Sequence, residues 1–359
     1  MSLVLTLLVC SVLFFLRNAN FDGAPRLPET WANERERLVK ENGGNDKSEE
    51  AVKRGLMWLA AQQVDDGSWS FDGVSQDKIA ATALALLPFL AAGEMDFPIA
   101  GGGVHKGAHE KTVAKGIDWL SRQMDQYGRG FKGTDNMYSH AMATMALCKA
   151  AGRSKKPAVK AKAKQAIEYL LQAQGRNGSW GYTGKGPSEG DTSIAGWQIQ
   201  ALAAADWAGI PFDNREKVYE RADKFLVSVS KDNGATYGYT VPGESKTLTP
   251  VGLLSRQTMG TMSPRHPAFH RGLDFVSKSP PLKDEFDTYY FYYATRAMFL
   301  RGGDEWHKVW NPKMRDLLAN LQDTGDDKTT NGSWRKDMGF VGSSCGKLGT
   351  TALALLTLE

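Results

Sequence analysis

Two short segments of the sequence carry the side chains that are best suited to chemistry. Asp191 stands in the segment Ser-Glu-Gly-Asp-Thr-Ser and opens an apolar run that is predicted to be a helix. Asp287 opens a second apolar run, which is rich in aromatic residues. A carboxyl group at such a position either caps the free N–H groups of the helix or serves as a general acid. Asp191 and Asp287 are therefore the candidate catalytic residues.

Aromatic and polar residues near the starts of these helices are candidates for binding a ligand. Aromatic faces can cover an apolar chain or stabilise a positive charge. A run of consecutive aromatic residues must turn some rings toward the centre and others between helix layers, and core packing is the alternative role for most of them. The candidate ligand-binding residues are His140, Trp197, Gln198, Tyr289, Tyr290 and Tyr293.

The cysteines do not indicate a metal site. They stand at positions 10, 148 and 345, without a C-x2-C pair or a Cys/His cluster. We therefore predict no metal and no cofactor.

A repeated pair of helices must position these residues. The segment Gly-Leu-Met-Trp-Leu at residues 55–59 is echoed near residues 116, 166, 222, 272 and, more weakly, 315, at a spacing typical of helical repeats. Each copy is followed by a loop and a more apolar helix. These second helices are expected at residues 78–93, 137–152, 191–209, 248–260, 287–302 and from 348 onward. Because the first set carries charges on one face, we predict two concentric rings with the apolar set inside.

A Q-x3-G-x-W turn ends several of the outer helices. It is complete at residues 63–69 and 174–180, and Gln322, Gly332 and Trp334 keep it across an insertion. Glycine permits a tight turn, the indole packs over it, and the glutamine amide can satisfy backbone groups at the helix end.

These turns are similar to the QW motif of squalene-hopene cyclases and their relatives. The six hairpins resemble the α6/α6 toroid that those enzymes share with prenyltransferase β subunits, and the resemblance covers residues 48–359. It implies an all-α fold, an α6/α6 toroid. The repeated turns are structural, so they say little about activity.

The resemblance also implies where catalytic groups would stand. Class II terpene cyclases protonate their substrate from a D-x-D-D-T-A motif, whose last aspartate and threonine match Asp191 and Thr192. The proton donor of that motif falls on Gly190, which has no acid, so Asp191 as a simple helix cap is the alternative. Prenyltransferase β subunits bind zinc through a D-x-C-Y segment, and here Asp287 is kept while Tyr289 replaces the cysteine.

Composition divides the chain into three parts and limits its partners. Residues 1–16 are mostly apolar and predict a membrane anchor or an export signal, with a buried helix as the alternative. Residues 17–47 are polar and predict a linker, and residues 48–359 form the toroid. A net charge of +4 is too small to imply nucleic acid. We expect attachment to a membrane or export rather than a cytoplasmic location.

The leading hypothesis is a protein like a terpene cyclase or a prenyltransferase, which binds an isoprenoid or another apolar small molecule in its central cavity. A non-catalytic scaffold that presents the toroid to a protein partner at a membrane is the alternative. A glycan-processing barrel is a third possibility, since it would need two facing carboxylates, and Asp191 with Asp287 is the pair to consider.

Overall fold

The computed structural model describes residues 31–98, 104–154, 156–184 and 188–359. The apolar segment that we expect to be an anchor or a signal, residues 1–16, lies outside the described residues. Within the described part, no helix combines the length and the apolar character that crossing a bilayer requires.

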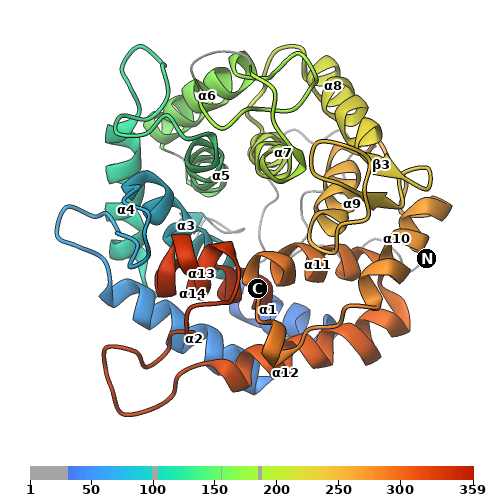
Figure 1. Cartoon of the computed structure of the whole chain (residues 1–359). Helices are drawn as coiled ribbons and strands as arrows, with labels where there is room; N and C mark the ends of the chain where they lie inside the picture. Colours follow the sequence, from blue (N-terminus) through green and yellow to red (C-terminus); the bar gives the residue numbers. More distant parts are fainter. Residues whose placement is uncertain (1–30, 99–103, 155, 185–187) are drawn as a thin grey trace.

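Twelve helices form two concentric rings, which confirms the predicted α6/α6 toroid (Figure 1). The inner ring consists of α3 (Lys78–Ala92), α5 (Met137–Arg153), α7 (Thr192–Trp207), α9 (Leu248–Met259), α11 (Thr288–Arg301) and α14 (Gly346–Leu358). The outer ring consists of α2 (Asp46–Ala61), α4 (Glu110–Gln123), α6 (Pro157–Gln172), α8 (Arg215–Ser228), α10 (Pro267–Ser277) and α12 (Asn311–Leu321). Each inner helix packs on the next, and α14 packs on α3, so the ring is closed.

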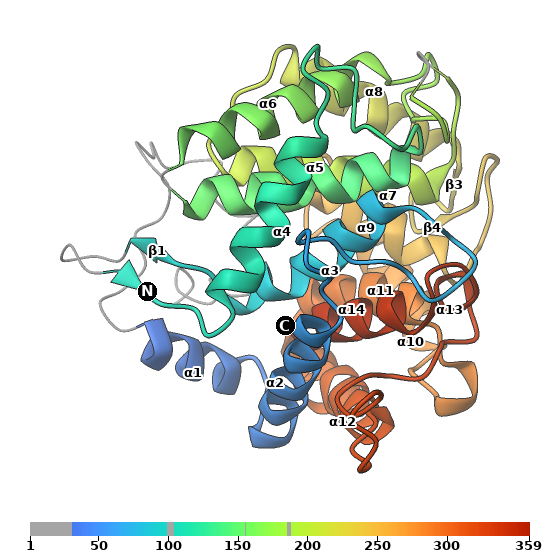
Figure 2. The same cartoon turned by 90° about the vertical axis from the view of Figure 1, so that its left-hand side faces the viewer.

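Smaller elements decorate the two ends of the ring. Two antiparallel pairs of short strands occur, β1 (Phe97–Pro98) with β2 (Val104–His105) and β3 (Ser230–Lys231) with β4 (Thr236–Tyr237). Single helical turns are the 3₁₀ helix η2 (Lys283–Glu285), the π-helix η3 (Glu305–Trp310) and the short helix α13 (Phe340–Ser344). In Figure 2, α1 and β1 lie toward one end, and β4 and α13 lie toward the other.

Helix α1 (Trp31–Glu41) lies within the segment that we expected to be a linker. Its Leu38 is fully buried, and its Arg35 forms ion pairs with Glu49 and with Glu359, the latter at 3.0 Å between Nη2 and Oε1. Glu359 directly follows α14, so α1 packs beside the end of the ring where this inner helix stops. Only about three turns long, α1 is too short to show a sustained period in the sequence.

The inner helices begin at the opposite end, which we call the mouth. Hydrogen bonds join their starts: Ser139 of α5 donates to Asp77 before α3 (2.7 Å between Oγ and Oδ2), and the hydroxyls of Tyr138 and Ser193 lie 2.6 Å apart. Side-chain caps occupy most of these starts. Asp77, Asn136, Asp191 and Asp287 each accept a hydrogen bond from a backbone N–H of the helix that follows.

The two complete Q-x3-G-x-W turns and the copy with the insertion, at Gln322, share one geometry. In each, the glutamine amide donates to the glycine carbonyl of its own turn and to a carbonyl of the next outer helix; the acceptors on those helices are Thr112, Val218 and Ala51. The indole N–H of each tryptophan donates to a carbonyl near the end of the preceding outer helix, on Leu59, Leu170 and Leu318. Each turn therefore links neighbouring hairpins, and the copy at Gln322 joins the sixth to the first.

We expect Gln322→Ala to destabilise the closed ring. The buried Nε2 of Gln322 donates to the carbonyls of Ala51 (2.7 Å) and Gly332 (2.9 Å), and both would lose this donor. The expected loss in the free energy of unfolding is about 1–3 kcal/mol, measured by urea denaturation. Gln62→Ala, which removes one long 3.4 Å bond at a partly exposed position, is the control and should have little effect. Equal losses for the two variants would contradict this role of the turn.

Candidate functional site

Asp191 is the centre of a hydrogen-bonded cluster at the mouth. It is 1% exposed and caps α7, with Oδ1 accepting from the backbone N–H groups of Ser193 (2.7 Å) and Ile194 (3.2 Å). The Ser193 hydroxyl donates to the same oxygen, and the Tyr182 hydroxyl donates to Oδ2. The carboxylate is thus both a helix cap and the acceptor of two side-chain hydroxyls.

Three tyrosines surround this carboxylate, and each comes from a different segment. The Tyr239 hydroxyl bonds to the Tyr182 hydroxyl, and the Tyr138 hydroxyl bonds to Ser193. The rings of Tyr138 and Tyr182 lie 5.7 Å apart between centroids. Partial burial and the hydrogen bond to Asp191 raise the pKa of Tyr182 above its ordinary value, and burial does the same for Tyr239. Both phenols therefore stay protonated at neutral pH.

A pocket of about 230 Å³ opens beside Asp191. Its described lining consists of Asn177, Tyr182, Glu189, Gly190, Asp191, Tyr239 and Thr240. Tyr182 and Tyr239 are each 46% exposed, and Glu189 is exposed as well. The pocket therefore lies at the surface of the mouth, outside the middle of the ring.

Gly190 has no room for the acid that the cyclase motif would place there. A Cβ atom built on Gly190 would lie 1.5 Å from the carbonyl oxygen of Trp180, which belongs to the preceding turn. Any side chain at this position would force the turn and the start of α7 apart. The local backbone packing therefore requires glycine at position 190.

Asp287 directly precedes α11 and is not part of the described lining of the Asp191 pocket. It caps the helix through the N–H of Tyr290 (3.1 Å), and Gly339 packs against it. Burial and the neighbouring Asp337 raise its pKa. Asp337 is buried and accepts hydrogen bonds from the N–H groups of Thr288 (3.0 Å), Gly339 (3.0 Å) and Gly342 (2.6 Å), so it holds the loop before α14 against α11.

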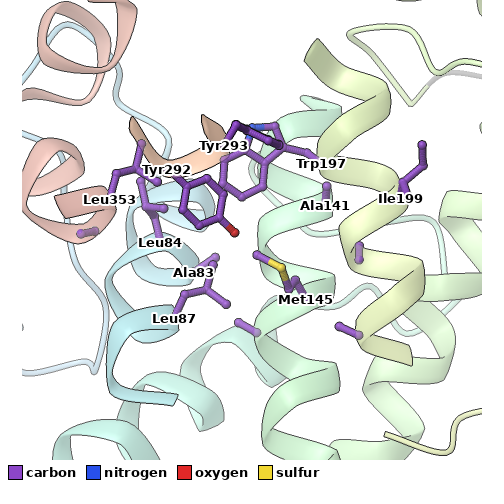
Figure 3. Close-up of a cluster of buried hydrophobic side chains, with 14 of the residues drawn as sticks. Ala83, Leu84, Leu87, Ala141, Met145, Trp197, Ile199, Tyr292, Tyr293 and Leu353 are labelled. Atoms are coloured by element: carbon purple, nitrogen blue, oxygen red, sulfur yellow. The ribbon is translucent and has the colours of Figure 1, made fainter. Parts of the chain in front are cut away.

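Side chains fill the middle of the ring below the mouth. Trp197 stacks on Tyr292 with centroids 5.9 Å apart and meets Tyr293 edge-on, and all three are at most 4% exposed. Figure 3 shows these rings in the same buried cluster as Leu84 and Leu87 of α3 and Met145 of α5. This packing closes the centre at the level of Trp197.

We call the packed side chains at the level of Trp197, Tyr292 and Tyr293 the plug. A polar network continues from the plug toward the end of the ring opposite the mouth. Gln200 donates to the Tyr293 hydroxyl (2.8 Å) and accepts from the Tyr292 hydroxyl (2.7 Å). Arg296 donates to Gln200 and, at 2.7 Å, to Tyr292, and it lies over the Tyr292 ring. The buried hydroxyls thus receive partners within the plug, as buried polar groups require.

Above the plug, three side chains of the inner helices remain partly exposed: Tyr138, Met142 and Tyr289. Tyr138 and Met142 stand four residues apart on one face of α5. Among the described residues, the Tyr289 hydroxyl has no hydrogen bond of good geometry, although it lies close enough to Tyr293 to influence the pKa of that phenol. The surface formed by Tyr138, Met142 and Tyr289 is therefore apolar and aromatic, with one unsatisfied hydroxyl, that of Tyr289.

Three of the predicted ligand-binding residues point elsewhere. His140 donates from Nε2 to the Ala166 carbonyl of outer helix α6 (2.8 Å), and it is buried between the rings. The hydroxyl of Tyr290 donates to the Ser279 carbonyl (2.6 Å), also on the outer side. Gln198 donates to the Met137 carbonyl (2.7 Å) at the start of α5. The polar groups of His140, Tyr290 and Gln198 are thus used in contacts between helices, whereas Trp197, Tyr289 and Tyr293 face the centre.

The residues missed by the sequence analysis include Tyr138, Tyr182, Tyr239, Gln200, Arg296 and Asp337. A signal for two of them is present, since Tyr182 and Tyr239 each follow a turn aromatic and a glycine, in Trp-Gly-Tyr and Tyr-Gly-Tyr. The glycines are required there: a Cβ on Gly181 would lie 1.9 Å from the Ser188 hydroxyl, and one on Gly238 would lie 2.1 Å from the Val241 carbonyl.

The replacement of cysteine by Tyr289 matters for the prenyltransferase comparison. The ring of Tyr289 packs against Tyr293, 4.9 Å between centroids, so this position supplies packing in place of a thiolate. Among the residues described by the structure, no group of three or more His, Cys, Asp or Glu side chains is arranged to hold a metal ion.

Comparison with known proteins identifies similar folds but no similar sequence. No protein-family model and no curated protein sequence matches the chain. The type II terpene cyclase MstE from Scytonema, in complex with geranylgeranyl dihydroxybenzoate, is similar in structure, with a TM-score of 0.59, 13% identity, and coverage of 87% of this chain and 96% of the cyclase.

Two other solved structures are similar to a comparable degree. An α-1,6-mannanase from Salegentibacter, in complex with α-1,6-mannotriose, gives a TM-score of 0.60 at 10% identity over 88% of this chain and all of the mannanase (100%). An α-amylase from Clostridium perfringens gives 0.57 at 12% identity, over 86% of this chain and 98% of the amylase. The chain therefore has the fold of α/α toroid enzymes, a fold that serves unrelated substrates.

His140 should make the stability of the protein depend on pH. Burial lowers its pKa from the ordinary value of 6.5 to about 4, so the unfolded chain takes up a proton before the folded chain does. Stability is fully present above pH 6.5 and falls as the pH drops toward 4, by about 3 kcal/mol in total. Denaturation of wild type and His140→Gln across this window measures the difference, with the exposed His307→Gln as control. The same pH dependence in wild type and His140→Gln would contradict the assignment.

Proposed function

We propose that the chain is a terpene-cyclase-like toroid that binds an isoprenoid or another neutral apolar small molecule at its mouth. The observation that carries this proposal is the set of partly exposed side chains, Tyr138, Met142 and Tyr289, above a floor of Trp197 and Tyr293. Such a surface offers an apolar ligand contact on several sides, and rings are well suited to cover a hydrocarbon chain.

The side chain at position 289 supports the cyclase-like form of the hypothesis over the prenyltransferase-like form. Tyr289 stands where the prenyltransferase motif has its zinc-binding cysteine, and its ring packs against Tyr293. Charge does not separate the two forms, because carboxylates and lysines both lie near the starts of the inner helices. The carboxylates are Asp77, Asp191, Asp287 and Asp337, and the lysines are Lys78, Lys246 and Lys347.

The side chains at positions 190 and 191 do not favour cyclisation by the class II route. Gly190 stands where the proton donor is expected, and the Asp191 carboxylate is taken up by four hydrogen bonds. We therefore infer that the toroid binds its ligand without protonating it. The plug at Trp197 further restricts the ligand to the mouth.

Filling the mouth with a larger side chain should weaken the binding of an apolar ligand. Met142→Trp adds bulk between Tyr138 and the plug, while Met57→Trp adds the same bulk on the outer helix α2, where Met57 is 56% exposed. We expect squalene and geranylgeraniol to quench tryptophan fluorescence in the wild type and in Met57→Trp, and to bind at least about tenfold more weakly to Met142→Trp. Thermal denaturation of both variants checks that they fold.

Mass spectrometry of the same incubations tests for turnover. We expect squalene and geranylgeraniol to be recovered unchanged, because no free acid stands at the donor position. Cyclised products would contradict the non-protonating form of the proposal, and equal binding by the two tryptophan variants would contradict the mouth as the binding site.

A scaffold is the second candidate function, and a patch of exposed apolar residues favours it. Val74, Met338 and Phe340 are 81%, 70% and 78% exposed, and the hydrogen bond from the Val74 N–H to the Ser343 carbonyl brings their loops together at the mouth. Exposed apolar residues that gather in this way are typical of contact surfaces. In this form of the proposal, residues 1–16 attach the toroid to a membrane and the patch meets a protein partner.

A further inference from the structure

We propose that the pocket beside Asp191 binds a small organic cation, of the quaternary ammonium type, between Tyr182 and Tyr239. The pocket of about 230 Å³ is lined among described residues by two carboxylates, two tyrosines, Asn177, Thr240 and Gly190. This inference is separate from the proposed binding of an apolar molecule, since it concerns another set of side chains on the outer side of Asp191.

The charge balance of the pocket favours a cation. Asp191 and Glu189 are acidic, and no lysine or arginine occurs in the described lining. The start of α7 carries a partial positive charge that offsets about half of the charge on Asp191. Glu189 is exposed and lines the pocket. It adds a second negative charge to the pocket.

The hydrogen bonds already present select the kind of cation. Asp191 accepts from two backbone N–H groups and from the hydroxyls of Ser193 and Tyr182, so little acceptor capacity is left for a ligand N–H or O–H. A primary ammonium or a sugar needs such acceptors. A quaternary ammonium donates no N–H hydrogen bond and is attracted to the carboxylates through its charge, so it suits a carboxylate whose lone pairs are occupied.

The aromatic side chains supply the second part of the recognition. Tyr182 and Tyr239 are fixed to each other and to Asp191 through their hydroxyls, yet each stays 46% exposed along the pocket. Tyrosine faces attract ammonium groups through the ring quadrupole, and aromatic side chains beside carboxylates are a common way to bind methylated ammonium. The hydroxyl network holds both side chains in place before a ligand arrives.

The size of the pocket limits the ligand to a headgroup. Pockets for drug-sized ligands have volumes of about 300–1,000 Å³, and the 230 Å³ here is smaller. A trimethylammonium group with a short substituent suits this space. An isoprenoid chain does not, so a ligand of the apolar mouth would lie on the other side of Asp191.

Choline and its uncharged carbon isostere test the proposal directly. Choline, tetramethylammonium and 3,3-dimethylbutan-1-ol, which has the shape of choline without the charge, are titrated into the full chain and followed by calorimetry and by NMR of the ligand. We expect saturable, millimolar binding of choline and tetramethylammonium, weakened by added salt, and much weaker binding of the neutral alcohol.

Two variants at exposed positions locate the site. Glu189→Gln removes the charge and Tyr239→Leu removes the ring, and each should weaken choline binding by about fivefold. Matched controls are Glu216→Gln on outer helix α8 and Tyr127→Leu, since Glu216 is exposed and Tyr127 is 71% exposed. Tyr239→Phe keeps the ring but loses the bond to Tyr182, so it should retain most of the affinity.

Several outcomes would overturn the proposal. It fails if no saturable binding of choline occurs, if the neutral alcohol binds equally well, or if Glu189→Gln and Tyr239→Leu bind like their controls. Binding of mannose in place of choline would indicate a carbohydrate site. Quenching by squalene in the Met142→Trp experiment is independent of these results, so failure of one proposal is distinguishable from failure of the other.

Discussion

Closure of the ring depends on the glutamine of the repeated turn. Its amide donates both to its own turn and to a carbonyl of the next outer helix, and the copy at Gln322 reaches back to α2. Only a glycine fits beside it: Gly178 has a φ of 94°, and a Cβ there would lie 2.0 Å from the Arg221 carbonyl. These contacts fix three of the hairpins against the next one, at Gln63, Gln174 and Gln322. Because every inner helix follows an outer helix in a hairpin, all six inner helices begin at the same end of the ring, and the mouth lies there.

Carboxylates gather at the mouth for the same structural reason. Inner helices that start together bring their positive ends together, and acidic side chains are the natural caps for such ends. Asp77 and Asp287 have this role, and Asp191 adds bonds from Ser193 and Tyr182. An aspartate at the start of an inner helix therefore has a structural role whether or not it takes part in chemistry. Gly190, directly before Asp191, packs against the Trp180 carbonyl, which leaves no space for a side chain at that position.

The sequence predicted the helices well because their signals are local. Apolar periodicity, turn glycines and capping residues placed α5 and α9 within one residue of their observed bounds. The direction in which an individual side chain points was harder to predict from the sequence, since successive side chains on a helix are rotated by about 100° around its axis. Tyr289 faces the mouth while Tyr290 faces the outer ring, and His140 turns toward α6. Tyr182 and Tyr239 lie in loops that only the closed ring brings together, so no local pattern could pair them.

The fold leaves the choice of ligand to the side chains at the mouth. Its solved neighbours hold a geranylgeranyl compound in one case and a mannotriose in another, on similar rings of helices. In this chain, the stack of Trp197 on Tyr292 and the contacts of Gln200 with Arg296 fill the centre of the ring with buried side chains. Tyrosines lie on both sides of Asp191: Tyr182 and Tyr239 line the pocket beside it, and Tyr138 and Tyr289 lie above the plug. We infer that selectivity in this toroid comes from the surface of the mouth, where charge and aromatic rings act together, and not from the volume enclosed by the ring.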